Sequence, residues 1–425
     1  MSVVEPLPIG ITACRAYVEQ LLFPVNSGSD RIGLELENYT YRKLGEGLVT
    51  VPLFGPDSLA EAIMAVAAEH GGIANVTDDG KLRSVDLPGG ARFLFEPGGQ
   101  IEISTPACES IVTLEGELRS MQEMLVRVTE KNGIQFGQSG TNPWFDAEEI
   151  GNQLPWQRYI AMKEYFDQIG PYGKQMMLQT CSMHINMEAG HDEETRIKRI
   201  VTANLLVPFA TALFANSSLI GGKRTGHSSY RSVIWQHTDP LRTGILPVHQ
   251  LRGNMDREML IDMYLELVMN APVIFTSSSG YHPLPRHYDL KYWLQNPING
   301  LLPCEKDLAQ HVTLLFPEVR LKGYIEIRSV DAPPRAWQMI PVIFYSSLLY
   351  NPGNLDKTLD ILLPYSNLLN ELHKKSTYGL KDDLVFDLSK QLMQIALNSP
   401  ETSTQLTSFA ERYTFKRNSF ADDNC

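Results

Sequence analysis

The chain has few cysteines, fewer basic than acidic residues, and no long apolar run. Its five cysteines are scattered over 425 residues without a CxxC pair. An odd, unclustered set argues against a metal–thiolate site or a disulfide framework and favours a reducing compartment. Lys and Arg number 37 against 49 for Asp and Glu, a formal net charge of −12. This acidic balance argues against general nucleic-acid binding, which requires a basic surface.

Membrane and targeting patterns are also missing from the sequence. No apolar run approaches the length of a membrane span, and the N-terminal residues lack the basic-then-apolar order of a signal peptide. We therefore expect a cytoplasmic protein with no membrane partner. No internal repeat, low-complexity tract or linker divides the chain, and 43% of its residues are hydrophobic. Because this composition supports a large core, we expect residues 1–425 to form a single domain.

Four segments alternate between apolar and polar side chains, as strands with one buried face do. In residues 324–331, Ile325 and Ile327 point to one side and Glu326 and Arg328 to the other. The same alternation recurs at 31–37, 99–104 and 182–187. If these strands share one sheet, one face packs on helices and the other gathers the polar side chains of Glu35, Glu37, Glu102, His184, Glu326 and Arg328.

Such a face has a definite chemistry. Crowded carboxylates repel one another unless cations neutralise them. Oxygen ligands with one imidazole suit Mg²⁺ or Mn²⁺ better than zinc, which prefers thiolate and imidazole. On the same strand, Glu326 suits a hard cation and Arg328 suits phosphate or carboxylate oxygens, so the two can meet one ligand. The alternative is a solvated strand face on which they merely form an ion pair.

Helical periodicity and capping residues predict most of the remaining structure. Two short strands are expected between Gly72 and Glu96, followed by a tight turn at 96–100, whose sequence is EPGGQ. Residues 275–300 are expected to be irregular. The C-terminal part is predicted to be entirely helical. Helices are expected at 11–23, 58–69, 109–131, 153–169, 193–217, 256–270, 337–350, 355–375, 382–397 and 401–416.

Residues 221–244 form the most conspicuous loop in the sequence. This stretch is rich in basic residues and also contains Tyr230, Ile234 and Trp235, which argue against disorder. A loop of this length is typically functional or disordered. We interpret it as a partly ordered cover that supplies cations to an anionic ligand. The alternative is a solvated surface loop. Its basic residues are Lys223, Arg224, Arg231 and Arg242.

Six motifs in order resemble the glutamate–cysteine ligases, in the branch with the plant and many bacterial enzymes. They are RIGLELE, EPGGQIEIS, MMLQTCSMHINME, ATALFANSSLIGGKRTG, YRSVIWQHTDPLRTG and FPEVRLKGYIEIRSVD. The segment RYIAMKEYFDQIG also resembles the actinobacterial member of the ergothioneine pathway. The resemblance runs from about residue 30 to 350 and implies an α+β, glutamine-synthetase-like fold. That fold has a curved, mainly antiparallel sheet with helices on its outer face. It implies one catalytic domain, with a core at about 30–350 and a helical part at about 351–425.

The resemblance also implies a reaction. Family members use ATP and Mg²⁺ to join the γ-carboxyl of L-glutamate to the amine of L-cysteine. A γ-glutamyl phosphate forms first, and the amine then displaces phosphate. The products are γ-glutamylcysteine, ADP and phosphate, in the first step of glutathione-type thiol biosynthesis.

The resemblance further implies roles for individual residues. Arg328 would steady the transferred phosphoryl group, with Glu326 beside it as a second catalytic residue. Arg231 would bind the carboxylate of an amino-acid substrate, and Lys223 and Arg224 would meet nucleotide phosphates. Glu96 joins the metal cluster through the resemblance alone. The implied metal ligands are Glu35, Glu37, Glu96, Glu102, His184 and Glu326.

Three other functions remain open on the sequence. A sister carboxylate–amine ligase with another amino-acid or amine acceptor would share every motif. A non-catalytic nucleotide-binding regulator would have lost a carboxylate or an arginine, and the sequence shows no such loss. A guanidino kinase shares the sheet architecture but releases a phosphorylated substrate. The sequence does not fix the oligomeric state, and alternation places Cys181 on the apolar side of its strand.

Overall fold

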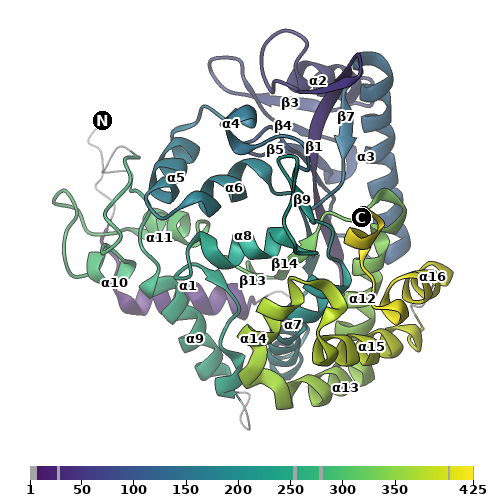
Figure 1. The fold of residues 1–425 in the computed structure, drawn as a ribbon. Helices are drawn as coiled ribbons and strands as arrows, with labels where there is room; N and C mark the ends of the chain where they lie inside the picture. Colours follow the sequence, from purple (N-terminus) through teal and green to yellow (C-terminus); the bar gives the residue numbers. More distant parts are fainter. Residues whose placement is uncertain (1–6, 26–28, 252–255, 277–280, 401–402, 425) are drawn as a thin grey trace.

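One antiparallel sheet of ten strands organises the computed structural model (Figure 1). The structure describes residues 7–25, 29–251, 256–276, 281–400 and 403–424. The strand order is β13-β14-β8-β1-β6-β5-β4-β3, and β2 and β7 both pair with β1. The strands are β1 (Ile32–Leu44), β2 (Gly47–Thr50), β3 (Ile73–Val76), β4 (Leu82–Asp86), β5 (Arg92–Phe95), β6 (Ile101–Ser104), β7 (Gln135–Gly137), β8 (Ser182–Met187), β13 (Val319–Leu321) and β14 (Ile325–Asp331).

The four strands predicted from alternation are neighbours in this sheet, in the order β14, β8, β1 and β6. Their registers bring the polar positions together. Glu35 pairs with His184 across β1 and β8, and Glu37 pairs with Glu102 across β1 and β6. Glu326 pairs with Asn186 across β14 and β8. The prediction of an α+β fold with a mainly antiparallel sheet is confirmed.

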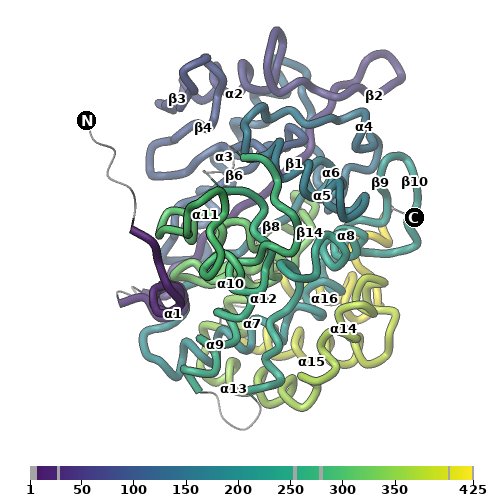
Figure 2. The backbone as a smooth tube through the Cα atoms, turned by 90° about the vertical axis from the view of Figure 1, so that its left-hand side faces the viewer, coloured from purple at the N-terminus to yellow at the C-terminus, as the bar shows by residue number. Residues whose placement is uncertain are grey.

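The apolar face of the four strands is fully buried. Leu34, Ile103, Ile185 and Ile327 are all 0% exposed and belong to the main hydrophobic core. Helix α7 (Glu193–Leu213) packs behind β14, and helices α13, α14 and α15 pack in turn on α7. Figures 1 and 2 show these C-terminal helices at the end of the molecule opposite α2, β3 and β4. Among the described residues, no helix is both long enough and apolar enough to cross a membrane.

The helices confirm most of the sequence pattern and correct it in several places. Helix α6 was missed: Pro171 ends the predicted helix but also opens a new one, because proline fits the first helical position. Three strands, not two, lie between Gly72 and Glu96, and the helix predicted at 355–375 is divided in two. Residues 275–300 contain a short helix. The helices are α1 (Ile11–Leu22), α2 (Leu59–Ala68), α3 (Ile111–Asn132), α4 (Ala147–Ile150), α5 (Gln157–Asp167), α6 (Pro171–Gln179), α7, α8 (Tyr230–Thr238), α9 (Arg257–Asn270), α10 (Leu290–Trp293), α11 (Glu305–Val312), α12 (Met339–Leu349), α13 (Pro352–Leu362), α14 (Leu369–Ser376), α15 (Asp383–Leu397) and α16 (Thr404–Arg412).

The segment 221–244 is more ordered than the sequence suggested. Helix α8 occupies its centre, and Ser229 caps that helix by accepting the N–H of Ser232. A two-stranded hairpin, β9 (Leu219–Ile220) and β10 (Lys223–Arg224), precedes the helix. After it, β11 (Thr243–Gly244) pairs in parallel with β12 (Phe316–Pro317). The expectation of a partly ordered segment agrees with this structure, but the sequence pattern did not predict the capped helix with a buried face.

Candidate active site

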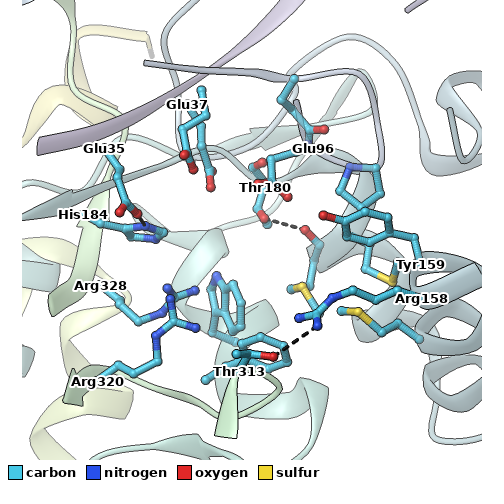
Figure 3. Close-up of a pocket in the computed structure, with 18 residues that line it drawn as sticks. Glu35, Glu37, Glu96, Arg158, Tyr159, Thr180, His184, Thr313, Arg320 and Arg328 are labelled. Atoms are coloured by element: carbon cyan, nitrogen blue, oxygen red, sulfur yellow. Dashed lines mark hydrogen bonds and ion pairs between the residues drawn. The ribbon is translucent and has the colours of Figure 1, made fainter. Parts of the chain in front are cut away.

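A pocket lies over the polar face of β1, β6 and β8, facing helices α5, α6 and α8 (Figure 3). Carboxylates from the sheet lie on one side, and Arg158 and Tyr159 of α5 lie on the other. Arg320 and Arg328 come from the hairpin of β13 and β14. The lining residues are Glu35, Glu37, Glu96, Pro97, Gln100, Glu102, Arg158, Tyr159, Met162, Met176, Met177, Thr180, His184, Trp235, Thr313, Phe316, Arg320 and Arg328.

Hydrogen bonds connect the carboxylates of β1 through β8. His184 Nδ1 lies 2.9 Å from Glu35 Oε2, and His184 Nε2 lies 2.9 Å from Ser182 Oγ. The backbone N–H and the hydroxyl of Ser182 both donate to Glu37 Oε2, at 2.6 and 2.9 Å. Asn186 Nδ2 donates to Glu35 Oε1 at 3.2 Å. These bonds orient Glu35 and Glu37 toward the same space.

The EPGGQ turn fixes Glu96 and Glu102 on either side of it. The N–H of Gly99 donates to the carbonyl of Glu96 at 2.8 Å, and Gly99 has a φ of +78°. A Cβ on Gly98 would lie 2.3 Å from the carbonyl oxygen of Leu178, so only glycine allows the turn to approach α6 this closely. Gly98 therefore allows the close packing and Gly99 the left-handed conformation of the turn, and together they bring Glu96 into the pocket beside the carboxylates of β1 and β6.

Burial and like charge perturb the carboxylates that have no cation beside them. Burial, reinforced by the charge of Glu37, raises the pKa of Glu96 to about 8. Burial, with the charges of Glu35, Glu96 and Glu37, raises the pKa of Glu102 well above its usual range. Burial also opposes the ionisation of Glu35, but the hydrogen bond with His184 helps to bring its net pKa below the usual value. Without a cation, Glu96 is therefore mostly protonated at neutral pH.

Glu326, by contrast, is surrounded by cations. Arg320 binds it through two hydrogen bonds, Nε to Oε2 at 2.6 Å and an Nη to Oε1 at 2.9 Å. Lys322 Nζ donates to Oε1 at 3.0 Å, and Arg328 donates to Oε2 at 3.0 Å. Burial disfavours the charge, but Arg320 and Arg328 outweigh it and hold the pKa of Glu326 well below its usual range. Glu326 is therefore firmly ionised.

Among the described residues, two groups of side chains could each hold a metal ion. Glu35, His184 and Glu326 form one group and Glu37, Glu102 and His184 the other, and within each group the ligand atoms lie within 4.8 Å of one another. Carboxylate oxygens with one imidazole fit Mg²⁺ or Mn²⁺. Burial, together with neighbouring carboxylates, raises the pKa values of Glu96 and Glu102, and a cation bound beside them would favour their ionised forms. The residues present therefore fit a hard divalent cation.

Arg158 on α5 faces this cluster from the opposite wall. Its guanidinium donates to Thr313 Oγ1 at 3.1 Å, and within the described part of the chain no carboxylate lies at ion-pair distance from it. Trp235 of α8 also lines the pocket, and its buried indole N–H has no partner among the described residues. An available guanidinium and an unused N–H donor suit an anionic, hydrogen-bonding ligand such as an amino-acid carboxylate.

The structure does not bring every predicted cation to the pocket. Lys223 and Arg224 are exposed on β10 and do not line it. Arg231 is buried behind the wall: its guanidinium donates to the backbone carbonyl of Arg328 at 2.6 Å. Arg242 is paired with Asp239 at 2.8 Å. Sequence reasoning missed Arg320, Lys322, Arg158, Tyr159 and Trp235. Arg320 could have been found from the sequence, because it lies opposite Glu326 across a tight hairpin.

A second cavity reaches the cluster from the other end of the strands. It shares Glu35 with the pocket and continues past Lys322 and Tyr324. Ser104 and Thr105 supply hydroxyl groups to its wall. Glu35 therefore lies between two cavities. One contains Arg158 and Trp235, and the other contains Lys322 and a tyrosine ring.

Comparison with known proteins identifies the class of this arrangement. A family model described as Glutamate-cysteine ligase family 2 (GCS2) matches residues 31–403. The chain is 30% identical over 383 residues to the chloroplastic glutamate–cysteine ligase of Brassica juncea. This alignment covers 87% of this chain and 71% of the relative. The enzyme of the same name from Arabidopsis thaliana is 30% identical over 383 residues, covering 87% and 70%. A crystal structure of glutamate–cysteine ligase from Francisella tularensis in complex with AMP covers 93% of this chain and 94% of its own, at 11% identity and a TM-score of 0.43.

The family match and these relatives therefore make the chain an enzyme of the ligase class. It belongs to glutamate–cysteine ligase family 2. The family and the enzyme class predicted from the six motifs are both confirmed. The expectation of a cytoplasmic protein is wrong by the same comparison, because the named plant relatives are chloroplastic enzymes. The sequence pattern could not reveal this, since compartment leaves no mark on the catalytic motifs.

Proposed function

We propose that this enzyme joins the γ-carboxyl of L-glutamate to the amine of L-cysteine in one catalytic domain, with ATP as co-substrate. The γ-carboxylate oxygen attacks the γ-phosphorus of ATP, and ADP leaves. The cysteine amine then attacks the acyl carbon of γ-glutamyl phosphate, loses a proton, and phosphate leaves. The supporting observation is the pocket itself, where clustered carboxylates face three guanidinium groups, those of Arg158, Arg320 and Arg328.

In this proposal ATP and the amino acids occupy different cavities. We place the nucleoside of ATP in the cavity beyond Glu35, where Tyr324 offers a ring and Lys322 a charge near the phosphates. The amino acids then occupy the pocket, where Arg158 meets a substrate carboxylate. This arrangement puts the phosphates at the carboxylate cluster between them. It favours Lys322 over Lys223 and Arg224 as the phosphate-binding cation, because those two are exposed on β10.

The carboxylate cluster would hold Mg²⁺, with Mn²⁺ as a substitute. Its ligands would be Glu35, Glu37, Glu102, His184 and Glu326, with Glu96 beside them. A divalent cation there would neutralise phosphate charge and help to orient the transferred group. Arg328 lies next to Glu326 and supplies a donor to the oxygens on which charge develops. For Arg231, contact with a substrate carboxylate stays a prediction.

The test is an ADP-release assay with purified enzyme, ATP and Mg²⁺ across pairs of amino acids. We expect turnover with L-glutamate and L-cysteine, and γ-glutamylcysteine as the isolated product. Products AMP and pyrophosphate would contradict the acyl-phosphate route. Turnover with L-glutamate and another amine, but not with L-cysteine, would replace this assignment with that of a sister ligase.

A further inference from the structure

Asp331, the last residue of β14, lies on the pocket side of the sheet although alternation predicts the opposite. Counting from Ile325 and Ile327 would place it on the apolar face. The register with β8 passes from Ile327–Ile185 to Val330–Met183, so β14 contains one extra residue. This bulge sends Val330 into the core and pairs Asp331 with Ser182. Bulges beside active sites commonly re-aim a side chain in this way.

The re-aimed carboxylate binds two other elements of the fold. Its Oδ2 accepts the backbone N–H of Asn216 at 2.8 Å and the hydroxyl of Ser217 at 2.6 Å, just after α7 ends. Its Oδ1 accepts the hydroxyl of Ser229, the N-cap of α8, at 3.0 Å. Asp331 is 1% exposed, so these bonds form away from bulk water, where each has more energetic weight.

Arg231 completes this network on the α8 side. An Nη of Arg231 lies 3.8 Å from Asp331 Oδ1, and the backbone N–H of Arg231 donates to Ser217 Oγ at 3.0 Å. The other Nη donates to the carbonyl of Arg328. Arg231 and Arg328 both lie near the Trp235 ring, at 5.8 and 5.3 Å from its centroid. The chain of contacts therefore runs from Asp331 through Arg231 to the Trp235 ring and to the backbone of Arg328, two residues whose side chains line the pocket.

The side chain of Asp331 is tightly packed against Gly140. A Cβ on Gly140 would lie 2.5 Å from Asp331 Cγ, and Gly140 itself donates its N–H to the carbonyl of Asn216 at 2.8 Å. A larger residue at 140 would displace the carboxylate without changing any charge. None of the side chains that bind Asp331 belongs to the carboxylate cluster of β1, β6 and β8.

We infer that Asp331 is a positioning residue for the phosphoryl-transfer half of the proposed reaction. By fixing α8 and Arg231 against β14, it holds the backbone of Arg328 and the indole of Trp235 at the pocket wall. Small displacements of positioning groups far from the chemistry can lower turnover by about 10²-fold. This inference rests on the proposed function only for the identity of the reaction, because the contacts concern side chains of the pocket whichever amine is the acceptor.

The test compares Asp331→Asn with the wild-type enzyme, using the acceptor that the wild type accepts. The amide keeps the size but loses the charge opposite Arg231 and turns one acceptor into a donor. We expect kcat per folded molecule to fall about 10²-fold, with the KM for ATP within about threefold of wild type. Ser229→Ala removes one bond to Asp331 together with the hydroxyl that caps α8, but it keeps the charge opposite Arg231 and should give a smaller loss. Gly140→Ala displaces the carboxylate sterically and should reproduce the loss seen with Asp331→Asn.

The control is Asp30→Asn, which breaks the ion pair of Asp30 with the buried Arg199 of α7, at 2.6 Å, away from this network. It should lower the melting temperature without lowering kcat per folded molecule. Hydrogen exchange supplies a readout that does not depend on the reaction: Asp331→Asn should speed exchange in α8 and leave β6 and β8 protected. Wild-type turnover in folded Asp331→Asn, an equal kcat loss in Asp30→Asn, or exchange that is unchanged or faster everywhere would each overturn the inference.

Discussion

Replacing Arg328 by alanine should slow the chemistry far more than it weakens nucleotide binding. Its guanidinium lies in the pocket wall next to Glu326, and in the proposed function it meets the phosphoryl oxygens. Loss of one strong donor to developing charge costs about 10²–10³-fold in kcat, or roughly 2.7–4 kcal/mol. The KM for ATP should change little, because the carboxylate cluster and Lys322 stay in place.

The structure also predicts how stability responds. After Arg328→Ala, Glu326 keeps its bonds to Arg320 and Lys322, so its charge stays paired. The backbone carbonyl that accepts Arg231 is unaffected by the side-chain change. Glu326→Gln is the more disruptive change, because three cations then surround a neutral amide. Breaking buried ion pairs from one side typically costs about 3–5 kcal/mol. Glu326→Gln should therefore melt at a lower temperature than Arg328→Ala.

The melting temperature and kcat are measured on the same preparations of each variant. Thermal melting gives the folded fraction, and ADP release at a temperature where both variants are folded gives kcat. Arg328→Lys serves as the matched control, since it keeps a positive charge but not the planar fork, and should retain intermediate activity. A stable Arg328→Ala protein with near-normal turnover would refute the role assigned to Arg328. It would favour the alternative in which Glu326 and Arg328 merely pair on the sheet.

Three further predictions test the metal, the carboxylates and the cations. Chelation with EDTA should abolish turnover and Mg²⁺ should restore it; full activity after exhaustive chelation would remove the cluster from the mechanism. In the metal-free protein the pKa of Glu96 is raised from 4.5 to about 8, so the folded state holds a proton that the unfolded chain releases. The stability that protonated Glu96 contributes is therefore complete below pH 4.5 and is lost as the pH rises through about 8. The melting temperature in EDTA should fall over this range. A melting temperature independent of pH would contradict the raised pKa. Arg231→Lys should raise the KM for glutamate more than that for ATP if Arg231 binds a carboxylate, whereas Arg158→Lys should do so if Arg158 does; kinetics of both variants decide between them.

Strand alternation predicted the sheet and most of the cluster because burial fixes the register. The strands β1, β6, β8 and β14 each have one buried face, and a slip by one residue would expose it. The polar positions Glu35, Glu37, Glu102, His184 and Glu326 had therefore to meet on the other face. Asp331 escaped this logic, because one extra residue in β14 reverses the alternation, and nothing in the residue types of that strand indicates the bulge.

The cations were harder to predict because their placement depends on tertiary contacts. A dense group of basic residues at 221–244 attracted the functional interpretation, yet these residues have different environments. Arg231 and Arg242 are 1% and 0% exposed and support the fold from inside, whereas Lys223 and Arg224 are exposed on a hairpin. Arg158 reaches the pocket from a helix whose sequence shows only ordinary periodicity. Local density of charge therefore says little about which cation meets a ligand.

The distribution of charge across the cluster indicates where a metal ion is most needed. Glu326 already has three cationic partners, and its pKa is depressed. Glu96 and Glu102 have none at ion-pair distance among the described residues, and their pKa values are raised. A divalent cation bound near Glu102 would relieve repulsion, whereas one bound at Glu326 must compete with Arg320 and Lys322. A divalent cation should therefore bind more tightly at Glu37, Glu102 and His184 than at Glu326. A cation that did bind Glu326 would release Arg320, whose guanidinium could then meet phosphate oxygens.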